Sequence, residues 1–378
     1  MKYITMIITL IFVISILSFH SNAIEYEFEI GEKEADLQND LSKLINSLPG
    51  DIKDKLIPIN EESASDISQK YSFEFFLDFI KESFFQHLPN QLQTLSGMVG
   101  FILIISLLNK LNSTMNTLTP ALNMCTGLTS FLAIFTTQQN VLSTTSVFLS
   151  TLSETMLLIV PIMESIYLLQ GNYMLSAVTS TGINVMISFT ENLFSNAIVP
   201  AVNISFLMAV VASVTQNKTM VFLSRTLRNI ITFAIITIMT LMTFSLTLQI
   251  STSSAADNFT NRTVRFALGS YIPIVGGAVS ETYSLIKGSI SLIKNLAGTT
   301  AIVILLLLCA GPIISLALSR LVIYITTNLS GILGCDREEN IFNEIGSNYT
   351  LLIAITIASV VMYIIAIAQF CKTVVMVT

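Results

Sequence analysis

Long apolar runs, separated by short polar stretches, dominate the chain from residue 91 to its end. Because about 20 apolar residues cross the hydrocarbon core of a bilayer as a helix, each run predicts a membrane span. Six runs are strongly apolar: 92–109, 117–137, 194–215, 229–250, 297–319 and 349–370. Ser, Thr, Asn and Glu weaken two further runs, at 152–170 and 174–190. The pattern predicts an all-α, polytopic membrane helix bundle over residues 91–378, with about six to eight spans.

The stretch 271–295 differs from the other runs because it is apolar yet rich in Gly and Ser. Pro273 removes a backbone donor, and Gly276 and Gly277 permit positive φ, so an unbroken helix is not expected through them. Backbone groups freed at membrane depth must line a cavity or be covered by protein. We therefore expect a broken or re-entrant helix here, with close packing of small residues as the alternative.

Residues 1–23 have the layout of a secretory signal peptide. A single lysine precedes an apolar run over 4–17, and Ser21 and Ala23 are the small residues expected before a cleavage site. An uncleaved first transmembrane helix is the alternative. In both cases the segment 24–70, with 12 acids and five lysines, is expected outside the cytoplasm, because its lack of net positive charge suits translocation.

Residues 71–90 are predicted to form an amphipathic helix. Apolar side chains recur there every three or four residues, with charged side chains between them. The apolar positions are Phe73, Phe76, Leu77, Ile80, Phe84 and Leu88. Such a helix can lie in the membrane interface or pack on the bundle, and the sequence leaves both arrangements open.

Composition supports a membrane protein and limits its partners. Hydrophobic residues make up 52% of the 378 residues and charged residues only 11%, whereas about a quarter of an average soluble domain is charged. Half of the 24 acids lie in the segment 24–70, so the remainder of the chain is nearly neutral. No basic stripe exists to bind phosphates, which disfavours nucleic-acid binding and leaves the lipid bilayer as the expected surroundings.

Basic residues between the spans predict their orientation. By the positive-inside rule, the basic residues that follow or join strong spans are placed in the cytoplasm, opposite the acidic segment. These residues are Lys110, Lys218, Arg225, Arg228 and Arg320. Arg262 and Arg265 then fall outside, against the rule.

Carboxylates inside the weaker runs are the most informative side chains. An ionised acid at membrane depth is costly, so it normally faces a bundle interior or an aqueous cavity and has a partner. We take Glu164 and Glu281 as candidate pore or cavity residues, together with Pro161 and the break at Pro273. The alternative for both acids is the headgroup level, where we place Glu191.

An offset of 112 residues suggests an internal repeat. It pairs Pro161 with Pro273, and Pro200 with Pro312. The repeat units would cover 151–250 and 263–370. If three helices of each unit cross the membrane, the second copy is inverted, which is a recurrent transporter design. Coincidence is the alternative, because apolar identities are frequent in such a chain.

Enzyme signatures are absent from the sequence. It contains no GxxxxGK[ST], HExxH or GxSxG motif, no CxxC pair and only two histidines. We therefore expect no catalytic residues, no metal site and no cofactor, and an energised process would need an ATPase on another chain.

The run GSYIPIVGGAVSETYSLIKGS, from Gly269 to Ser289, is the most distinctive local sequence. Together with the signal peptide, the acidic segment and the Ser/Thr-rich polytopic body, it resembles the stage III sporulation protein AE family of endospore-forming bacteria. The resemblance implies a mother-cell membrane protein around the forespore, within a channel or secretion-like complex that sustains late forespore gene expression. It also implies partners: an ATPase and ring-forming proteins of the same operon, and a forespore membrane protein. No catalytic residues are established for that family.

Three functional interpretations remain open at this point. The first is the permease-like part of the sporulation channel. The second is an autonomous secondary transporter, favoured by the repeat and by the acids at membrane depth. The third is a non-conducting membrane scaffold that anchors partners through its acidic segment.

Overall fold

The computed structural model describes residues 30–53, 73–112, 119–215, 218–271 and 276–372, and every element in these ranges is a helix. The elements are α2 (Ile30–Ser47), α3 (Gly50–Lys53), α5 (Phe73–Asn112), α6 (Thr119–Leu169), α7 (Tyr173–Leu193), η1 (Phe194–Ile198), α8 (Val199–Thr215), α9 (Lys218–Tyr271), α10 (Gly276–Ile332) and α11 (Asp336–Lys372). The predicted all-α polytopic bundle is therefore confirmed. The predicted signal peptide, 1–23, lies outside the described residues.

Six helical segments in the described part of the chain are long and apolar enough to cross a membrane. They are Glu74–Lys110, Phe135–Leu169, Tyr173–Val211, Thr219–Ser253, Ala297–Ile332 and Asp336–Cys371. The shortest have 35 residues, or about 53 Å of helix, so each extends beyond the hydrocarbon core of about 30 Å. The number of spans lies at the lower limit of the prediction.

Two pairs of predicted spans are joined into single long helical segments. The runs 117–137 and 152–170 both belong to α6, and 174–190 and 194–215 are continuous through the π-helix η1. Polar residues do not end these helices, because their hydroxyls bond carbonyls of their own helix, as Thr144 Oγ1 does with the Asn140 oxygen at 2.9 Å.

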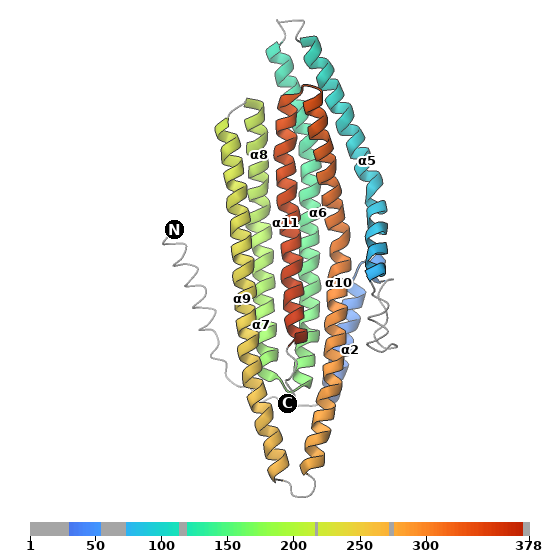
Figure 1. The fold of residues 1–378 in the computed structure, drawn as a ribbon, viewed down its shortest axis with the longest axis vertical. Coiled ribbons are helices and arrows are strands. Elements are labelled where there is room, and N and C mark those ends of the chain that lie inside the picture. Colours follow the sequence, from blue (N-terminus) through green and yellow to red (C-terminus); the bar gives the residue numbers. More distant parts are fainter. Residues whose placement is uncertain (1–29, 54–72, 113–118, 216–217, 272–275, 373–378) are drawn as a thin grey trace.

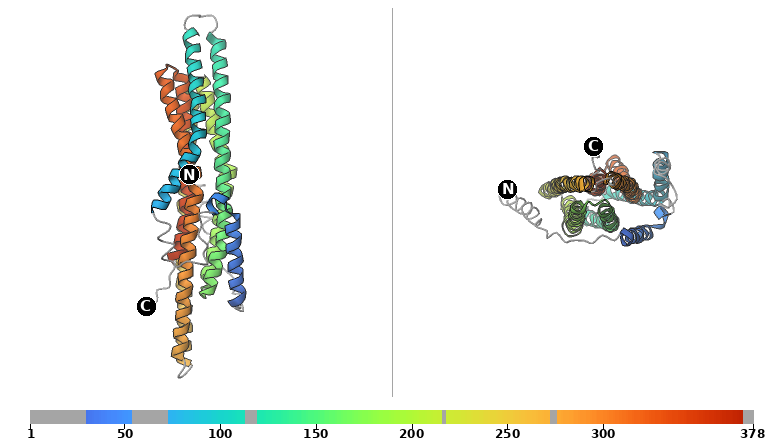
Figure 2. Two further views of the ribbon diagram at one scale, coloured as in Figure 1. Left: turned by 90° about the vertical axis from the view of Figure 1, so that its right-hand side faces the viewer. Right: turned by 90° about the horizontal axis from the view of Figure 1, so that it is seen from below.

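The helices run up and down in an antiparallel bundle (Figures 1 and 2). Helices α5, α8 and α10 end, and α6, α9 and α11 begin, at one end of the bundle. We call it the basic end because Lys110, in the last turn of α5, and Arg225, near the start of α9, lie toward it. Helix α2 and the α6–α7 turn lie toward the other end, which we call the α2 end. Beyond the α2 end, α9 and the first part of α10 project as a long hairpin.

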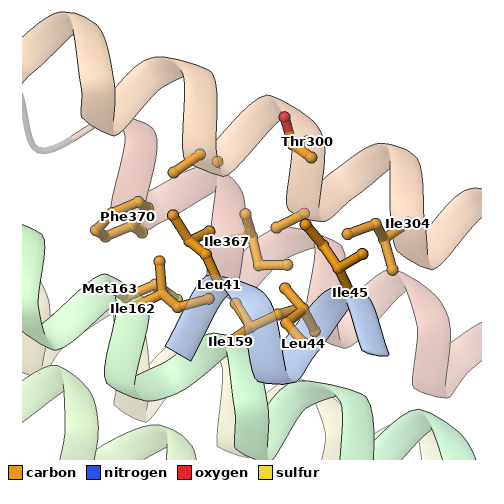
Figure 3. Close-up of a pocket in the computed structure, with 13 residues that line it drawn as sticks. Leu41, Leu44, Ile45, Ile159, Ile162, Met163, Thr300, Ile304, Ile367 and Phe370 are labelled. Carbon is orange, nitrogen blue, oxygen red and sulfur yellow. The ribbon is translucent and has the colours of Figure 1, made fainter. Parts of the chain in front are cut away.

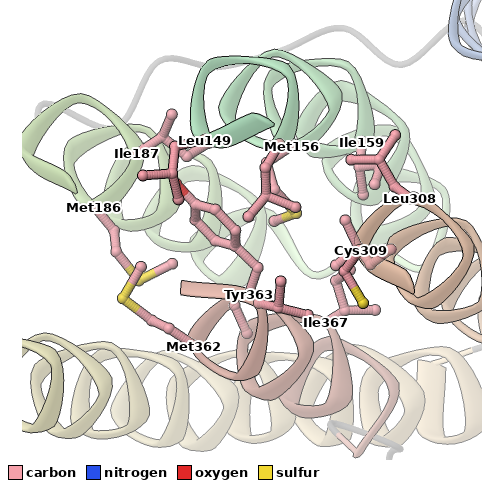
Figure 4. Packing of buried hydrophobic residues seen from close by; sticks show 14 of the residues in the cluster. Leu149, Met156, Ile159, Met186, Ile187, Leu308, Cys309, Met362, Tyr363 and Ile367 are labelled. Atoms are coloured by element: carbon pink, nitrogen blue, oxygen red, sulfur yellow. The ribbon is translucent and has the colours of Figure 1, made fainter. Parts of the chain in front are cut away.

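Helix α11 occupies the centre of the bundle and contacts α6, α8, α9 and α10. In Figure 4 its Met362, Tyr363 and Ile367 point toward apolar side chains of the surrounding helices. Near the α2 end, α10 approaches α11 so closely that a Cβ at Gly298 would overlap the Sγ of Cys371. Small residues permit such close approach between membrane helices.

The acidic segment contributes to the core of the bundle through α2, α3 and the residues between them. Leu44, Leu48 and Ile52 are buried in the main apolar cluster, and Figure 3 shows Leu41, Leu44 and Ile45 facing α6, α10 and α11. The Ile367 and Phe370 side chains of α11 lie on the opposite wall of the same small apolar cavity. This packing attaches α2 to one end of the bundle.

The predicted amphipathic helix, 71–90, corresponds to the first part of α5. From there α5 continues through Pro89 into the first span. Phe76 packs on the core, whereas Ile80 and Phe84 of the predicted apolar stripe are exposed. Phe79, which lies outside that stripe, is buried instead. The helix therefore packs through one edge and presents most of its apolar stripe outward.

Proline does not interrupt the described helices. Pro161 lies inside α6 and Pro312 inside α10. Neighbouring helices and hydroxyl side chains can satisfy backbone groups freed by proline in a membrane bundle. In the two repeat units, α7–α8 corresponds to α10, and α9 corresponds to α11. Corresponding helices run in the same direction (Figure 1), so the second unit is not an inverted copy of the first in these helices. The 112-residue repeat itself stays a prediction.

Candidate functional site

A polar cavity of about 310 Å³ lies between α5, α6, α10 and α11, on the side of the midplane nearer the basic end. Amide and hydroxyl side chains from all four helices line it, and no charged side chain does. The polar lining residues are Asn90, Gln91, Thr94, Thr137, Asn140, Thr144, Ser315, Ser319 and Tyr349. The cavity therefore offers hydrogen bonds without a net charge.

The lining hydroxyls satisfy part of their hydrogen-bonding capacity within their own helices. Thr94 Oγ1 donates to the Asn90 oxygen at 3.0 Å, and Ser319 Oγ donates to the Ser315 oxygen at 2.9 Å. Each hydroxyl oxygen keeps lone pairs for another donor. This local bonding lets apolar helices carry a polar strip without losing helical structure.

Tyr349 differs from the other lining residues. Its side chain is 1% exposed, and its hydroxyl hydrogen bonds to no group in the described part of the chain. Leaving a buried hydroxyl without a partner is costly, so such groups usually meet a water or another guest. The Tyr349 hydroxyl is itself buried, so the other amide and hydroxyl groups of the wall make the cavity a suitable site for a polar solute.

A charged cluster lies on the opposite face of α11. Glu344 is buried and accepts hydrogen bonds from both Arg225 and Arg228 of α9, with Arg225 Nε at 3.0 Å from Oε1. Arg228 is also buried, and its Nη1 donates to Ser224 Oγ at 3.0 Å. The Ser224 Oγ lies 3.1 Å from that of Ser205 on α8. This cluster connects α8, α9 and α11 through mutual polar contacts.

The predicted site residues do not gather around the polar cavity. Pro161 is half-buried in α6, and Glu164 lies near the α2 end of that helix. Glu164 is 20 residues from Thr144, or about 30 Å along the helix.

The other predicted site residues are Pro273, Gly276, Gly277 and Glu281. Pro273 lies outside the described residues. Gly276 and Gly277 begin α10, and Glu281 follows in its first turns, where the side chains are not described. The region 276–295 forms the start of a continuous helix rather than a separate element. The proposed roles of Glu281 and of the Pro273–Gly277 break stay predictions.

Sequence reasoning missed the cavity residues, although a weak signal exists. Asn90 with Thr94, and Ser315 with Ser319, are polar pairs at helical i, i+4 spacing within apolar runs. Glu191 also differs from expectation, because it lies near the middle of the span Tyr173–Val211 rather than at its end. The hydropathy dip around it was the signal of a polar environment at depth.

The fold and the cavity define a multi-pass α-helical membrane protein with a neutral polar cavity between its helices. The family model described as stage III sporulation protein AE matches residues 60–373. The chain belongs to the stage III sporulation protein AE family, and the resemblance seen in the sequence is thereby confirmed.

One relative is stage III sporulation protein AE of Bacillus subtilis (strain 168), with 23% identity over 166 residues. The match covers 44% of this chain and 42% of that protein, so it spans less than half of the relative's length. No solved structure matches the chain. The family membership supports a role in sporulation.

Proposed function

We propose that this protein is the permease-like membrane component of a complex that links mother cell and forespore and is required for endospore formation. It acts without catalysis of its own, in the mother-cell membrane around the forespore. Its partners are an ATPase and ring-forming proteins of the same operon, and a forespore membrane protein. Membership of a sporulation family and the six candidate spans support this assignment.

The polar cavity is the observation that carries the proposal. A scaffold needs no interior space, whereas a permease needs a polar path shielded from lipid. The cavity lies between four helices and is lined by neutral hydrogen-bonding groups, with Asn90, Asn140 and Thr144 at its exposed edge. These features suit an uncharged polar solute, or water, at part of a passage.

A secondary transporter that works without partners is the second candidate. Glu191 favours it, because this carboxylate lies near the middle of a candidate span beside a second, smaller polar cavity. Transport by the purified protein alone in lipid vesicles distinguishes this candidate from a complex component.

Filling the cavity tests the proposed passage. Thr94→Phe and Thr144→Phe place a large apolar side chain in the cavity, from α5 and α6 respectively. We expect a late forespore reporter to fall to the level of a deletion strain, because the added ring occupies the polar space. Spore yield, membrane level and recovery of operon proteins with a tagged chain are measured together.

Thr240→Phe and Thr252→Phe on α9 are matched controls. Both threonines are exposed, and their hydroxyls bond carbonyls of their own helix as those of Thr94 and Thr144 do. These variants should sporulate normally. Normal sporulation with a filled cavity contradicts the passage and favours the scaffold, provided that the variant reaches the membrane at the wild-type level.

A further inference from the structure

A second, smaller cavity lies beside the π-helix η1, near the middle of the candidate spans. Its volume is about 60 Å³, and α6, α7, η1, α8 and α11 all contribute to its wall. We call it the Glu191 crevice, after the one carboxylate in its lining. The other oxygen-bearing side chains are Ser146, Ser150, Ser153, Thr190, Ser359 and Tyr363. It shares no lining residue with the larger cavity.

The π-helix accounts for the local shape of the crevice. The segment Phe194–Ile198 interrupts the regular bonding between α7 and α8, and Phe194 and Val199 on either side both line the crevice. A π-helical turn is wider than an α-helical one and commonly occurs at functional sites. Here it lies immediately after Thr190 and Glu191, on the segment that faces Ser150 and Ser153 of α6.

Hydroxyl groups lead from the wall of the crevice to the centre of the bundle. Tyr363 is buried, and its hydroxyl lies 3.4 Å from the Oγ of Ser153 on α6. The Thr190 hydroxyl is a second hydrogen-bonding neighbour of Tyr363, and Glu191 is its acidic neighbour. The crevice thus brings one carboxylate and several hydroxyl oxygens together at membrane depth.

The charge of this lining selects one kind of ligand. Its side-chain donors are all oxygens, which suit hard cations such as alkali and alkaline-earth ions. One carboxylate balances a single positive charge, whereas divalent ions usually require more anionic ligands or retained water. No basic side chain lines the crevice to neutralise Glu191. Glu191 is exposed near the middle of a candidate span, where an ionised carboxylate is costly in lipid, so a bound cation lowers that cost.

We propose that the Glu191 crevice binds an alkali-metal cation. Glu191 supplies the charged ligand, and hydroxyls of Ser150, Ser153 and Thr190 are the candidate neutral ligands. The proposal does not depend on the passage through the larger cavity, and the experiment that follows reads binding without transport.

Carbodiimide labelling of the purified full-length protein in detergent tests the proposal. Dicyclohexylcarbodiimide modifies protonated carboxyl groups in apolar surroundings, and mass spectrometry locates the modified residue. At constant pH and ionic strength, sodium or potassium chloride should lower the labelling of Glu191 by about tenfold relative to choline chloride, since a bound cation competes with the proton.

Glu154 of α6 is the internal control. It lies near the middle of the span Phe135–Leu169 and is exposed, as Glu191 is in its own span, but it is not among the residues that line the crevice. Its labelling should not depend on the alkali cation. Equal labelling of Glu191 in sodium, potassium and choline overturns the proposal, as does equal protection of Glu154. The proposal is also overturned if the labelling of Glu191 changes with pH but not with the cation present.

Thermal unfolding separates binding from a general salt effect. Alkali ions should raise the Tm of the wild type and of Glu154→Gln over choline, but should leave that of Glu191→Gln unchanged. Ser153→Ala and Thr190→Val should each weaken the apparent cation affinity by about tenfold, the loss of one ligand bond. Unchanged affinity in both hydroxyl variants contradicts the assignment of ligands.

Discussion

Two faces of α11 bury polar groups in opposite ways. Asn348 faces α8, where Ser205 Oγ donates to its Oδ1 at 3.4 Å, close to the cluster of Glu344 and Arg228. The next residue, Tyr349, faces the neutral cavity between α5, α6 and α10. A helix turns by about 100° per residue, so one position along the chain separates the charged face from the cavity face.

The difference shows what each face contributes. On the charged face, Glu344 and Arg228 meet directly and connect α11 with α9. The Oδ1 of Asn348 accepts a hydrogen bond from Ser205 of α8, whereas its Nδ2 has no partner in the described part of the chain. On the cavity face, Ser319 bonds only within its own helix and the Tyr349 hydroxyl has no partner in the described part of the chain. Buried charges that pair directly hold helices in place, whereas the neutral side chains around the cavity keep lone pairs for a solute.

The largest expected effect is on the charged face. Glu344→Leu should destabilise the protein by about 3–5 kcal/mol, because it leaves Arg228 buried without its carboxylate. The measurement is unfolding in detergent, followed by tyrosine fluorescence since the chain has no tryptophan. The steady-state level in membranes should fall in parallel.

The double variant Arg228→Met with Glu344→Leu is the control. Replacing both charges with apolar side chains of similar volume removes the unpaired charge, so it should recover most of the lost stability. Arg225 remains, but its side chain is 61% exposed and can be solvated. If Glu344→Leu alone is as stable as the wild type, the cluster does not hold the bundle together.

A matched pair of serines gives a smaller difference between the two faces. Ser224→Ala removes the nearer of the two acceptors of Arg228 Nη1 and leaves Ser205 Oγ at 3.5 Å, so it should cost about 1–3 kcal/mol for a poorly satisfied buried donor. Ser319→Ala removes a hydroxyl that bonds only its own helix and should change the stability by less than about 0.5 kcal/mol. Equal losses in thermal unfolding would remove the distinction between the two faces.

The fold class was predictable because hydropathy over 20 residues reports burial in lipid directly. The helix ends were less predictable. The runs 117–137 and 152–170 became one helix because Thr144 and Thr151 bond carbonyls of their own helix, so a fall in hydropathy did not mean a break. The positive-inside rule requires Lys110 and Arg225 to lie on the same side of the membrane, and they lie toward the same end of the bundle.

The site was harder to predict because it depends on which helices meet. Asn90 and Tyr349 are 259 positions apart, and only the packing of α5 beside α10 and α11 brings them to one cavity. Hydropathy located acids at depth but not their neighbours, so Glu164 was favoured over Glu191. The hydroxyl lining of both cavities consists of Ser and Thr, which are individually common in membrane helices.

The smallest expected effect lies at the basic end, where α5 approaches the turn between α10 and α11. Burial raises the pKa of the Cys335 thiol, and the charge of Glu338 raises it further. Asn109 Nδ2, 3.9 Å from the sulfur, opposes the shift in part. A raised thiol pKa means less thiolate at a given pH, so alkylation of Cys335 should be slower than that of an ordinary thiol at pH 8.

The measurement uses a variant in which Cys335 is the remaining cysteine, with Asn340→Cys in a cysteine-free background as the exposed reference. The maleimide rate at Cys335 should continue to rise with pH after the reference has levelled off. Glu338→Gln should raise the Cys335 rate at pH 8, because it removes the second cause of the shift while burial remains. Identical pH profiles for Cys335 and the reference mean that this turn is open to water and that α5 does not cover it as the structure indicates.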